Sequence, residues 1–168
     1  NQQDNLPSKY SSIELGYTPE VRSQAPYGNC WAHSAFACLE IAMIKDNLGS
    51  PDTLELSIPH GIYYYFRPVV DPLDGTADDY VVTDDKTVTS MLQDGGFASY
   101  IGNSTLAWQG PVLAQDFLGY TELNEKYNFV EVSEALDTEE YAYGNKAAIV
   151  TEMAESRRPN IEEMKRAI

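Results

Sequence analysis

The residues of this chain best suited to covalent chemistry are its two cysteines, and Cys30 stands in a distinctive setting. It follows a turn-forming run that begins at Gln24 and directly precedes an apolar-periodic segment. Apolar residues spaced by three, four and one share one face of a helix. Here they are Trp31, Ala35, Phe36, Leu39, Ala42 and Met43. The pattern predicts a long helix from Cys30, with Asn29 as its N-cap and Gly49 as its stop.

Cys30 would lie in the first turn of that helix, where backbone N–H groups have no partner within the helix. These groups and the positive end of the helix dipole favour a thiolate, which is the nucleophilic form of the side chain. Cys38 falls two turns later in the helix interior, and we expect it to pack in the core. The two sulfurs would be roughly 12 Å apart by helix rise alone, too far for a disulfide.

The run around Cys30 resembles the catalytic-cysteine signature of the papain-like cysteine peptidases, Q-x-x-x-G-x-C-W-A-x-S. The matching residues are Gln24, Gly28, Cys30, Trp31, Ala32 and Ser34. The resemblance implies that Cys30 is the nucleophile and that Gln24 donates a side-chain hydrogen bond in the oxyanion hole, beside the Cys30 backbone N–H. The chain departs from the family at Tyr27, where many members have a disulfide-forming Cys, and at His33, which replaces an aromatic residue.

Two later stretches resemble other elements of the family's Cys-bearing lobe. Leu56-Ser57 is similar to the pair that opens the second helix of the Cys-bearing lobe, with Pro59 at an early helical position. A short helix is predicted over 87–93, and Gly95-Gly96 follows it. This Gly-Gly pair resembles the strip beside the family's cysteine, whose backbone pairs with extended substrate.

The resemblance implies substrate contacts from Gly95, Gly96, Phe97 and Trp31. Phe97 and Ala98 would contribute to the pocket for the second residue before the cut. Further along, residues 108–112 read Trp-Gln-Gly-Pro-Val, which is similar to a run in bacterial relatives of clostridial cell-wall peptidases.

Composition sets broad limits on partners. A chain of 168 residues that is 43% hydrophobic is one domain or a large part of one. A net charge of −15 argues against nucleic acid and against anionic membrane surfaces as partners. No apolar stretch is long enough to span a membrane, and the first residues lack the basic and apolar regions of a signal peptide.

Two further features contain residues that are common in functional sites. The stretch over 68–85 is acidic, and its part at 71–79 could wrap a calcium ion with oxygen ligands, but the spacing does not fit an EF-hand loop. We expect a solvated acidic loop there, and neither a metal nor a cofactor. His60 is expected to be a partly exposed residue of the second helix.

Cysteine-peptidase chemistry also needs a His as proton acceptor and an Asn or Asp to orient it. The family places them roughly 130–150 residues after the Cys, and no His follows His60 in this chain. His33 lies about 5–6 Å from Cys30 in Cβ terms. Because the family packs this position inward beneath the site, we do not expect His33 to be the base.

These observations predict an α+β protein, mainly the helical lobe of a papain-like fold, with a long central helix and few short strands. We expect a leader or extended arm over 1–12, the Cys-bearing lobe over 13–157, and the start of a truncated β lobe over 158–168. A strand is expected at 129–132, and a capping box at Asn160 opens the last helix.

The resemblance implies a cysteine endopeptidase that works through a thioester acyl-enzyme on peptide or protein substrates. It also implies a bacterial protein that is secreted, extracellular or at the cell surface. The His-bearing lobe would come from the same gene or a second chain, so the chain alone would be inactive. Two alternatives remain open. One is an inactive papain-like binding or adhesion module, and the other is a papain-like acyl-transfer enzyme such as a transpeptidase or deamidase.

Overall fold

The computed structural model describes residues 7–67, 69, 87–119, 136, 139–154 and 158–166. Of these residues, 45% are helical and 3% lie in β-bridges. The bridges are isolated pairs, Leu56 with Leu113 and Val112 with Lys146. The helices are α1 Cys30–Lys45, α2 Ile58–Phe66, α3 Val88–Gln93, α4 Ala98–Leu106, η2 Ala114–Asp116, α7 Glu139–Tyr143 and α8 Ile161–Arg166. The described part is therefore mostly helical, which is compatible with the expected α+β, helical-lobe class.

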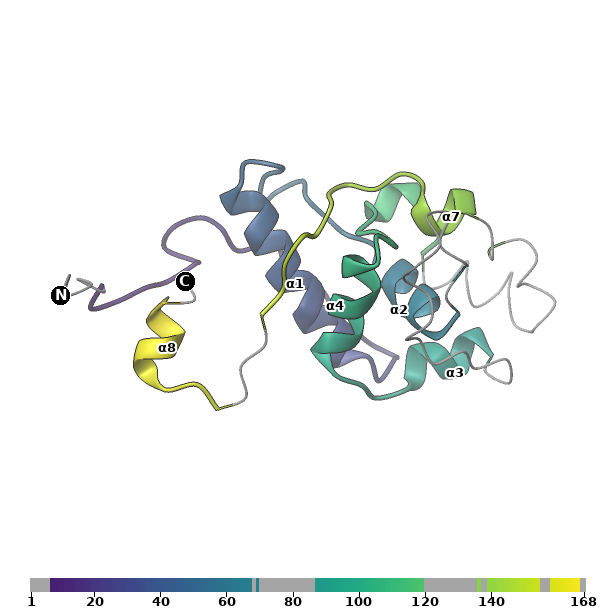
Figure 1. Ribbon diagram of the computed structural model, residues 1–168, viewed down its shortest axis with the longest axis horizontal. Helices are drawn as coiled ribbons and strands as arrows, with labels where there is room; N and C mark the ends of the chain where they lie inside the picture. The colour runs from purple at the N-terminus through teal and green to yellow at the C-terminus, as the bar shows by residue number, and fades with distance from the viewer. Residues whose placement is uncertain are drawn as a thin grey trace.

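Helix α1 is the longest element, and the other central helices pack around it. Helix α4 packs on α1 and α2, and α2 also packs on α3 (Figure 1). A glycine permits the close approach of α1 and α2, because a Cβ on Gly61 would lie 2.5 Å from the Phe36 ring. The core is rich in aromatic residues, with Trp31, Phe36, Tyr63, Tyr64, Tyr65 and Phe66 all buried. Packing against α2 and α4 holds α1 in place, and with it the first turn that carries Cys30.

The start of α1 is as predicted, and its end is not. Asn29 precedes the first helical residue, and its carbonyl oxygen accepts from the backbone N–H groups of Ala32 and His33 at 3.0 and 3.3 Å. The helix ends at Lys45, so the prediction of Gly49 as the stop is wrong. Asn47 adopts φ 60° instead, and this left-handed residue closes the helix with the 2.8 Å bond from Leu48 N–H to Met43 O.

One side of α1 is exposed, and it carries both cysteines. Cys30, Ser34, Cys38 and Ala42 recur every four residues, and all four are exposed. The expectation that Cys38 packs in the core is therefore wrong, and so is the assignment of Ala42 to the buried face. The apolar intervals located the buried stripe, but they did not show how narrow it is.

Side chains cap three of the helices, and of these caps only the box at Asn160 was predicted. Ser57 Oγ accepts from His60 N–H at 3.2 Å at the start of α2, and Thr87 Oγ1 accepts from Ser90 N–H at 3.1 Å at the start of α3. In α8, Asn160 and Glu163 form the reciprocal capping box, with bonds of 2.8 and 2.9 Å.

Helix α4 was not predicted. Its sequence contains small polar residues, and Ile101 is the buried apolar side chain at its centre. The hydroxyl groups of Ser104 and Thr105 donate hydrogen bonds to the Ile101 carbonyl at 3.0 and 2.8 Å. Because these hydroxyls are satisfied within the helix, they can be buried against α1 and α2 without an apolar period in the sequence.

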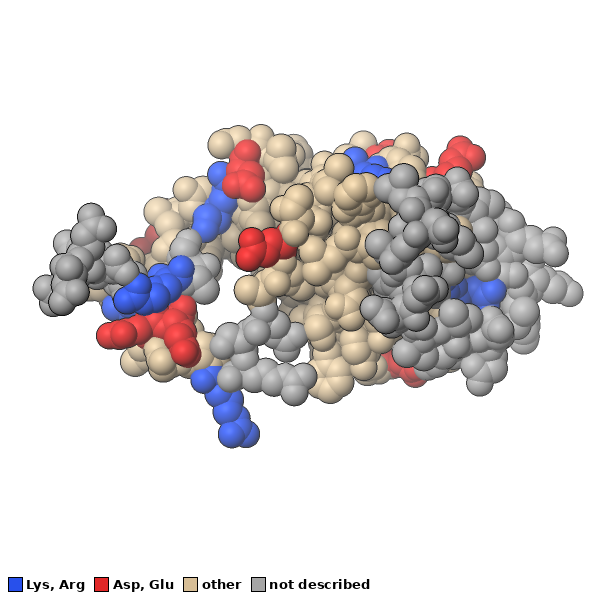
Figure 2. Space-filling view, in the orientation of Figure 1, with Lys and Arg blue, Asp and Glu red and all other residues tan. Residues whose placement is uncertain are grey.

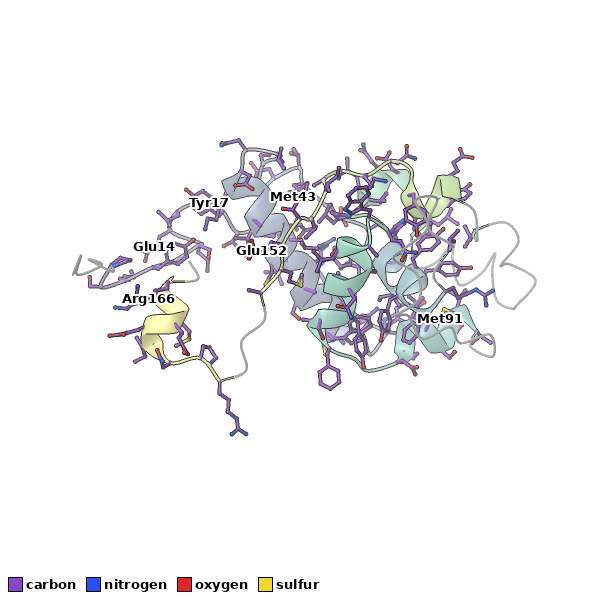
Figure 3. The ribbon with its side chains drawn as sticks, viewed as in Figure 1. Glu14, Tyr17, Met43, Met91, Glu152 and Arg166 are labelled. Carbon is purple, nitrogen blue, oxygen red and sulfur yellow. The ribbon has the colours of Figure 1, made fainter. Side chains whose placement is uncertain are left out.

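The N-terminal arm and α8 lie at the same end of the molecule, as the positions of Glu14 and Arg166 show in Figure 3. Residues 7–10 and Lys165 line a common pocket there. Tyr17 joins the arm to the core (Figure 3). On the face drawn in Figure 2, charged side chains of both signs gather over α8, and the other charged side chains of the described residues are scattered.

Some expectations fall outside the described residues. They include the acidic run 71–79 with its calcium alternative, and the strand expected at 129–132. Within the described ranges, no helix is both long and apolar enough to cross a membrane.

Candidate active site

The turn that leads into Cys30 is closed by Gln24. The Gln24 carbonyl accepts from Tyr27 N–H at 2.9 Å, and the Gln24 side-chain amide donates to the Tyr27 carbonyl, also at 2.9 Å. Tyr27 itself is buried. An amide NH₂ carries two hydrogens, and the bond to Tyr27 uses one of them. The other N–H of Gln24, the expected oxyanion donor, can serve a ligand.

The same turn is fastened to the end of α3. Gly28 N–H donates to Gln93 Oε1 at 3.2 Å, and Gln93 Nε2 donates to the Pro26 carbonyl at 3.4 Å, across 65 to 67 positions of sequence. A Cβ on Gly28 would lie 2.7 Å from the Gln93 carbonyl oxygen. The glycine of the cysteine motif is therefore required here by the approach of another backbone.

Trp31 makes a second fastening between α1 and the segment after α3. Its indole Nε1–H donates to the Asp94 carbonyl at 2.9 Å, and a Cβ on Gly96 would lie 2.8 Å from the Trp31 ring. Only 5% of Trp31 is exposed. The ring therefore supports the Gly96 backbone from behind and offers little surface for the substrate contact expected of it.

The segment beyond this support is open. Gly95 is exposed, and nothing lies within 4 Å of a Cβ built on it. Phe97 is 59% exposed, and its ring meets the Tyr100 ring at 5.6 Å between centroids. The structure thus places the expected residues Gly95, Gly96 and Phe97 next to the start of the Cys30 helix (Figure 1).

Two tyrosines complete the wall behind Gly96. Tyr65 and Tyr100 stack with their ring centroids 4.3 Å apart and 8° between planes, and Trp31 meets both rings edge-on. Burial, followed by the neighbouring Tyr100, raises the pKa of Tyr65 to about 12. The Tyr65 phenol therefore stays neutral at physiological pH and serves as an aromatic wall.

Cys30 is exposed at the first position of α1. No hydrogen bond joins its backbone N–H to another backbone carbonyl of the described residues. Such an N–H can donate to negative charge on a bound ligand. An exposed thiol, a backbone donor and the open segment at Gly95 therefore come together at this end of α1.

His33 is half-buried on the same helix. It borders an open groove of about 450 Å³, whose other walls include Arg22, Glu55, Pro59 and Leu118. Burial and then the charge of Arg22 lower the pKa of His33. The ring is thus neutral at pH 7, and its lowered pKa makes it a weak proton acceptor.

His60 is buried, contrary to the expectation of partial exposure. Only 1% of it is exposed, and its ring packs against Tyr64 and Phe117 at 4.6 and 4.9 Å between centroids. Because a carbonyl can only accept, His60 Nε2–H donates to the Tyr141 carbonyl at 3.0 Å. Burial lowers the pKa of His60 to about 4. The sequence missed this because the partners of His60 lie far along the chain.

Sequence reasoning also missed four residues that shape the site, namely Tyr65, Gln93, Asp94 and Tyr100. Their contacts join positions more than 30 residues apart, and no short-range pattern encodes such pairs. Gln93 ends the helix predicted over 87–93 and Asp94 precedes the Gly-Gly pair, but neither signal points to their partners. In the part of the chain that the structure describes, no group of His, Cys, Asp and Glu is arranged to hold a metal ion.

No family model matches this chain, and neither does any curated protein or solved structure. The functional argument therefore depends on the residues around Cys30 and on the contacts that surround them.

Proposed function

We propose that this chain is the Cys-bearing helical lobe of a papain-like cysteine endopeptidase. Cys30 would attack the carbonyl carbon of a peptide bond and form a thioester, and water would then hydrolyse that thioester. The Gln24 amide and the Cys30 backbone N–H would donate to the oxyanion of each tetrahedral intermediate. The supporting observation is the double fastening of the Cys30 turn to residues 93–96.

The fastening supports the proposal because a peptidase needs its nucleophile beside a surface that orders the substrate. Gly28 and Trp31 both belong to the cysteine motif, and each contacts the segment that carries Gly95 and Gly96. A helix that merely buried one apolar face would need neither contact. The open Gly95 backbone leaves room for an extended peptide to pair with the main chain.

The proton acceptor is proposed to come from a further lobe. Of the two histidines in the chain, His60 is buried and His33 has a lowered pKa. A second, β-rich lobe from the same gene or a second chain would supply a His, which takes the thiol proton and protonates the leaving amine. It would also supply the Asn or Asp that orients the His. In this proposal the protein works without a cofactor, outside the cell or at the bacterial surface.

The peptide strip can be tested with two alkylating reagents. A peptidyl chloromethyl ketone and plain iodoacetamide would each be applied briefly to the 168-residue chain, followed by peptide mapping. We expect the peptidyl reagent to increase the labelling ratio of Cys30 to Cys38 over that obtained with iodoacetamide. The same ratio for both reagents would show that no peptide is held beside Cys30.

Hydrolysis gives a separate test. We expect the chain alone to cleave peptide substrates negligibly, because removal of the base from a catalytic group forfeits several orders of magnitude in rate. Robust turnover that His33→Ala abolishes would contradict this and identify His33 as the base.

A second candidate function is a papain-like binding or adhesion module in which Cys30 is vestigial. The observation in its favour is the state of the two histidines, which leaves the thiol without a suitable base in this chain. A Cys30→Ser variant that keeps full peptide affinity, together with equal alkylation of Cys30 and Cys38 in the parent chain, would favour this module. A transpeptidase or deamidase would use the same cysteine machinery and would differ in the acceptor of the acyl group.

A further inference from the structure

A cavity separate from the Cys30 turn lies between residues 18–22 and α1. Its volume is about 260 Å³. Six residues of its lining matter to the argument, namely Thr18, Val21, Arg22, His33, Glu40 and Ile41. Residues of α1 thus form one side of the cavity, and residues 18–22 form the other.

Glu40 projects a buried carboxylate into this lining, with only 1% of the residue exposed. Its Oε1 atom accepts from Arg22 Nη2 at 2.6 Å and from Leu56 N–H at 2.8 Å. Its Oε2 atom is buried and has no hydrogen-bond partner among the described residues. Buried polar atoms in native proteins are nearly always paired, so this oxygen requires a donor.

Thr18 presents a second oxygen of the same kind. Its Oγ1 atom is buried and has no partner among the described residues, and Thr18 lines the same cavity. Two residues that line the cavity thus each carry a buried oxygen without a partner among the described residues, and one of these oxygens belongs to a carboxylate.

The charges around the cavity favour a cation. Glu20 and Glu40 line it, and Glu55 lies 3.6 Å from Arg22, whose guanidinium is engaged with Glu40, Glu55 and the Leu56 carbonyl. Two carboxylates thus contact one guanidinium, and a third, that of Glu20, belongs to the cavity lining. Burial raises the pKa of Glu40 in spite of Arg22 and the Leu56 N–H. A carboxylate in that position gains from a second cation.

We propose that this cavity binds a primary ammonium group, either of a free small amine or of a lysine side chain. An ammonium carries three donors on one nitrogen, and these can serve Glu40 Oε2 and Thr18 Oγ1 together. The carbon next to the nitrogen would lie against Val21 and Ile41, which also line the cavity. A quaternary ammonium carries the same charge but has no N–H, so it cannot satisfy either oxygen.

The test uses the whole 168-residue chain in methylammonium chloride, tetramethylammonium chloride and sodium chloride at equal ionic strength. We expect a saturable rise in Tm with methylammonium alone. A rise of the same size in all three salts, or none in any of them, would overturn the proposal and leave the two oxygens to water.

Two variants locate the effect. Thr18→Val keeps the shape of the side chain and removes its oxygen, and it should weaken methylammonium binding about fivefold. Thr53→Val is the matched control, because Thr53 lies outside the cavity lining, and it should bind like the parent chain. Equal binding by both variants would overturn the proposed site. Glu40→Gln should abolish binding, and Thr18→Val still decides the matter if that variant does not fold.

A final comparison identifies the source of the ammonium group. Nα-acetyl-lysine amide has a side-chain ammonium group, and Nα-acetyl-norleucine amide lacks it. Titration with each therefore gives the contribution of the ammonium group to binding. Tighter binding of the lysine amide than of methylammonium would indicate a peptide side chain. Binding of methylammonium alone would indicate a free amine. Binding of the norleucine amide as tight as that of the lysine amide would contradict an ammonium site.

Discussion

Cys30 and Cys38 lie on the same exposed side of one helix, yet their surroundings differ. Cys30 stands at the first position of α1, next to a turn that Gly28 and Trp31 fasten to residues 93–96. Cys38 stands in the middle of α1, where every backbone N–H is used by the helix. Exposure therefore does not separate the two thiols, and the difference between them must come from backbone and neighbours.

The two regions of α1 are also held in place by different forces. The first turn is positioned by two close contacts that only glycine allows. Gly28 lies against the Gln93 carbonyl, and Gly96 lies against the Trp31 ring. The middle of the helix is positioned by the buried pair of Glu40 and Arg22. The comparison shows that one helix can place a reactive group by steric fit at its end while a buried charge secures its middle.

The largest expected effect concerns the middle of α1. Arg22→Ala would leave the Glu40 carboxylate buried without its partner, and we expect a loss of about 3–5 kcal/mol in the free energy of unfolding. Urea denaturation monitored by circular dichroism measures it. Lys9→Ala is the matched control, because the Lys9–Glu14 pair is exposed and should cost under about 1 kcal/mol. Similar losses for both variants would show that the buried pair does not secure the helix.

Acid should destabilise the fold through His60, and the two thiols can be compared only at a pH where the chain stays folded. His60 has a pKa of about 4 in the folded chain and an ordinary value of 6.5. The unfolded chain binds the extra proton between these values, so the stabilisation is complete above pH 6.5 and is lost as pH falls to 4. We expect this loss to be about 3 kcal/mol. Urea denaturation from pH 7.5 to 3.5 measures it, and His60→Phe should flatten the dependence.

The next effect distinguishes two neighbouring glycines at the Cys30 end. Gly96→Ala would push a methyl group to 2.8 Å from the Trp31 ring, and we expect a loss of about 1–3 kcal/mol. Gly95→Ala is the matched control, since nothing lies within 4 Å of the added methyl group, and it should change stability by less than about 0.5 kcal/mol. Thermal unfolding of both variants measures the difference. Equal stabilities would mean that the Trp31 support for the strip is not tight.

The smallest expected effect is the difference in thiol reactivity itself. Backbone N–H groups at a helix start stabilise negative charge by about 0.3–1 kcal/mol at exposed sites. We therefore expect iodoacetamide to label Cys30 about twofold to fivefold faster than Cys38 at pH 7.5, as measured by timed peptide mapping. Both thiols are exposed, so access cannot produce this difference. Equal labelling rates would show that the start of the helix does not make Cys30 more reactive than Cys38.

The sequence by itself determined the features that depend on residues within about four positions of one another. Asn29 and Asn160 directly precede helices as predicted, and the expected helices after Ser57 and Thr87 also begin there. The side-chain caps of Ser57, Thr87 and Asn160 are hydrogen bonds between residues three positions apart, so the local sequence carries the information they need. The Gly-Gly pair and the cysteine motif were recognisable for the same reason.

Only the tertiary structure decided what depends on distant partners. It brought Gly28 to Gln93 and Trp31 to Asp94, buried His60 under Phe117, and left Cys38 in solvent. These outcomes depend on which helix faces which, and a contact across 60 or more positions leaves no periodic trace in either segment. Helix periodicity shows which residues share a side, but burial is decided by the neighbours that cover that side.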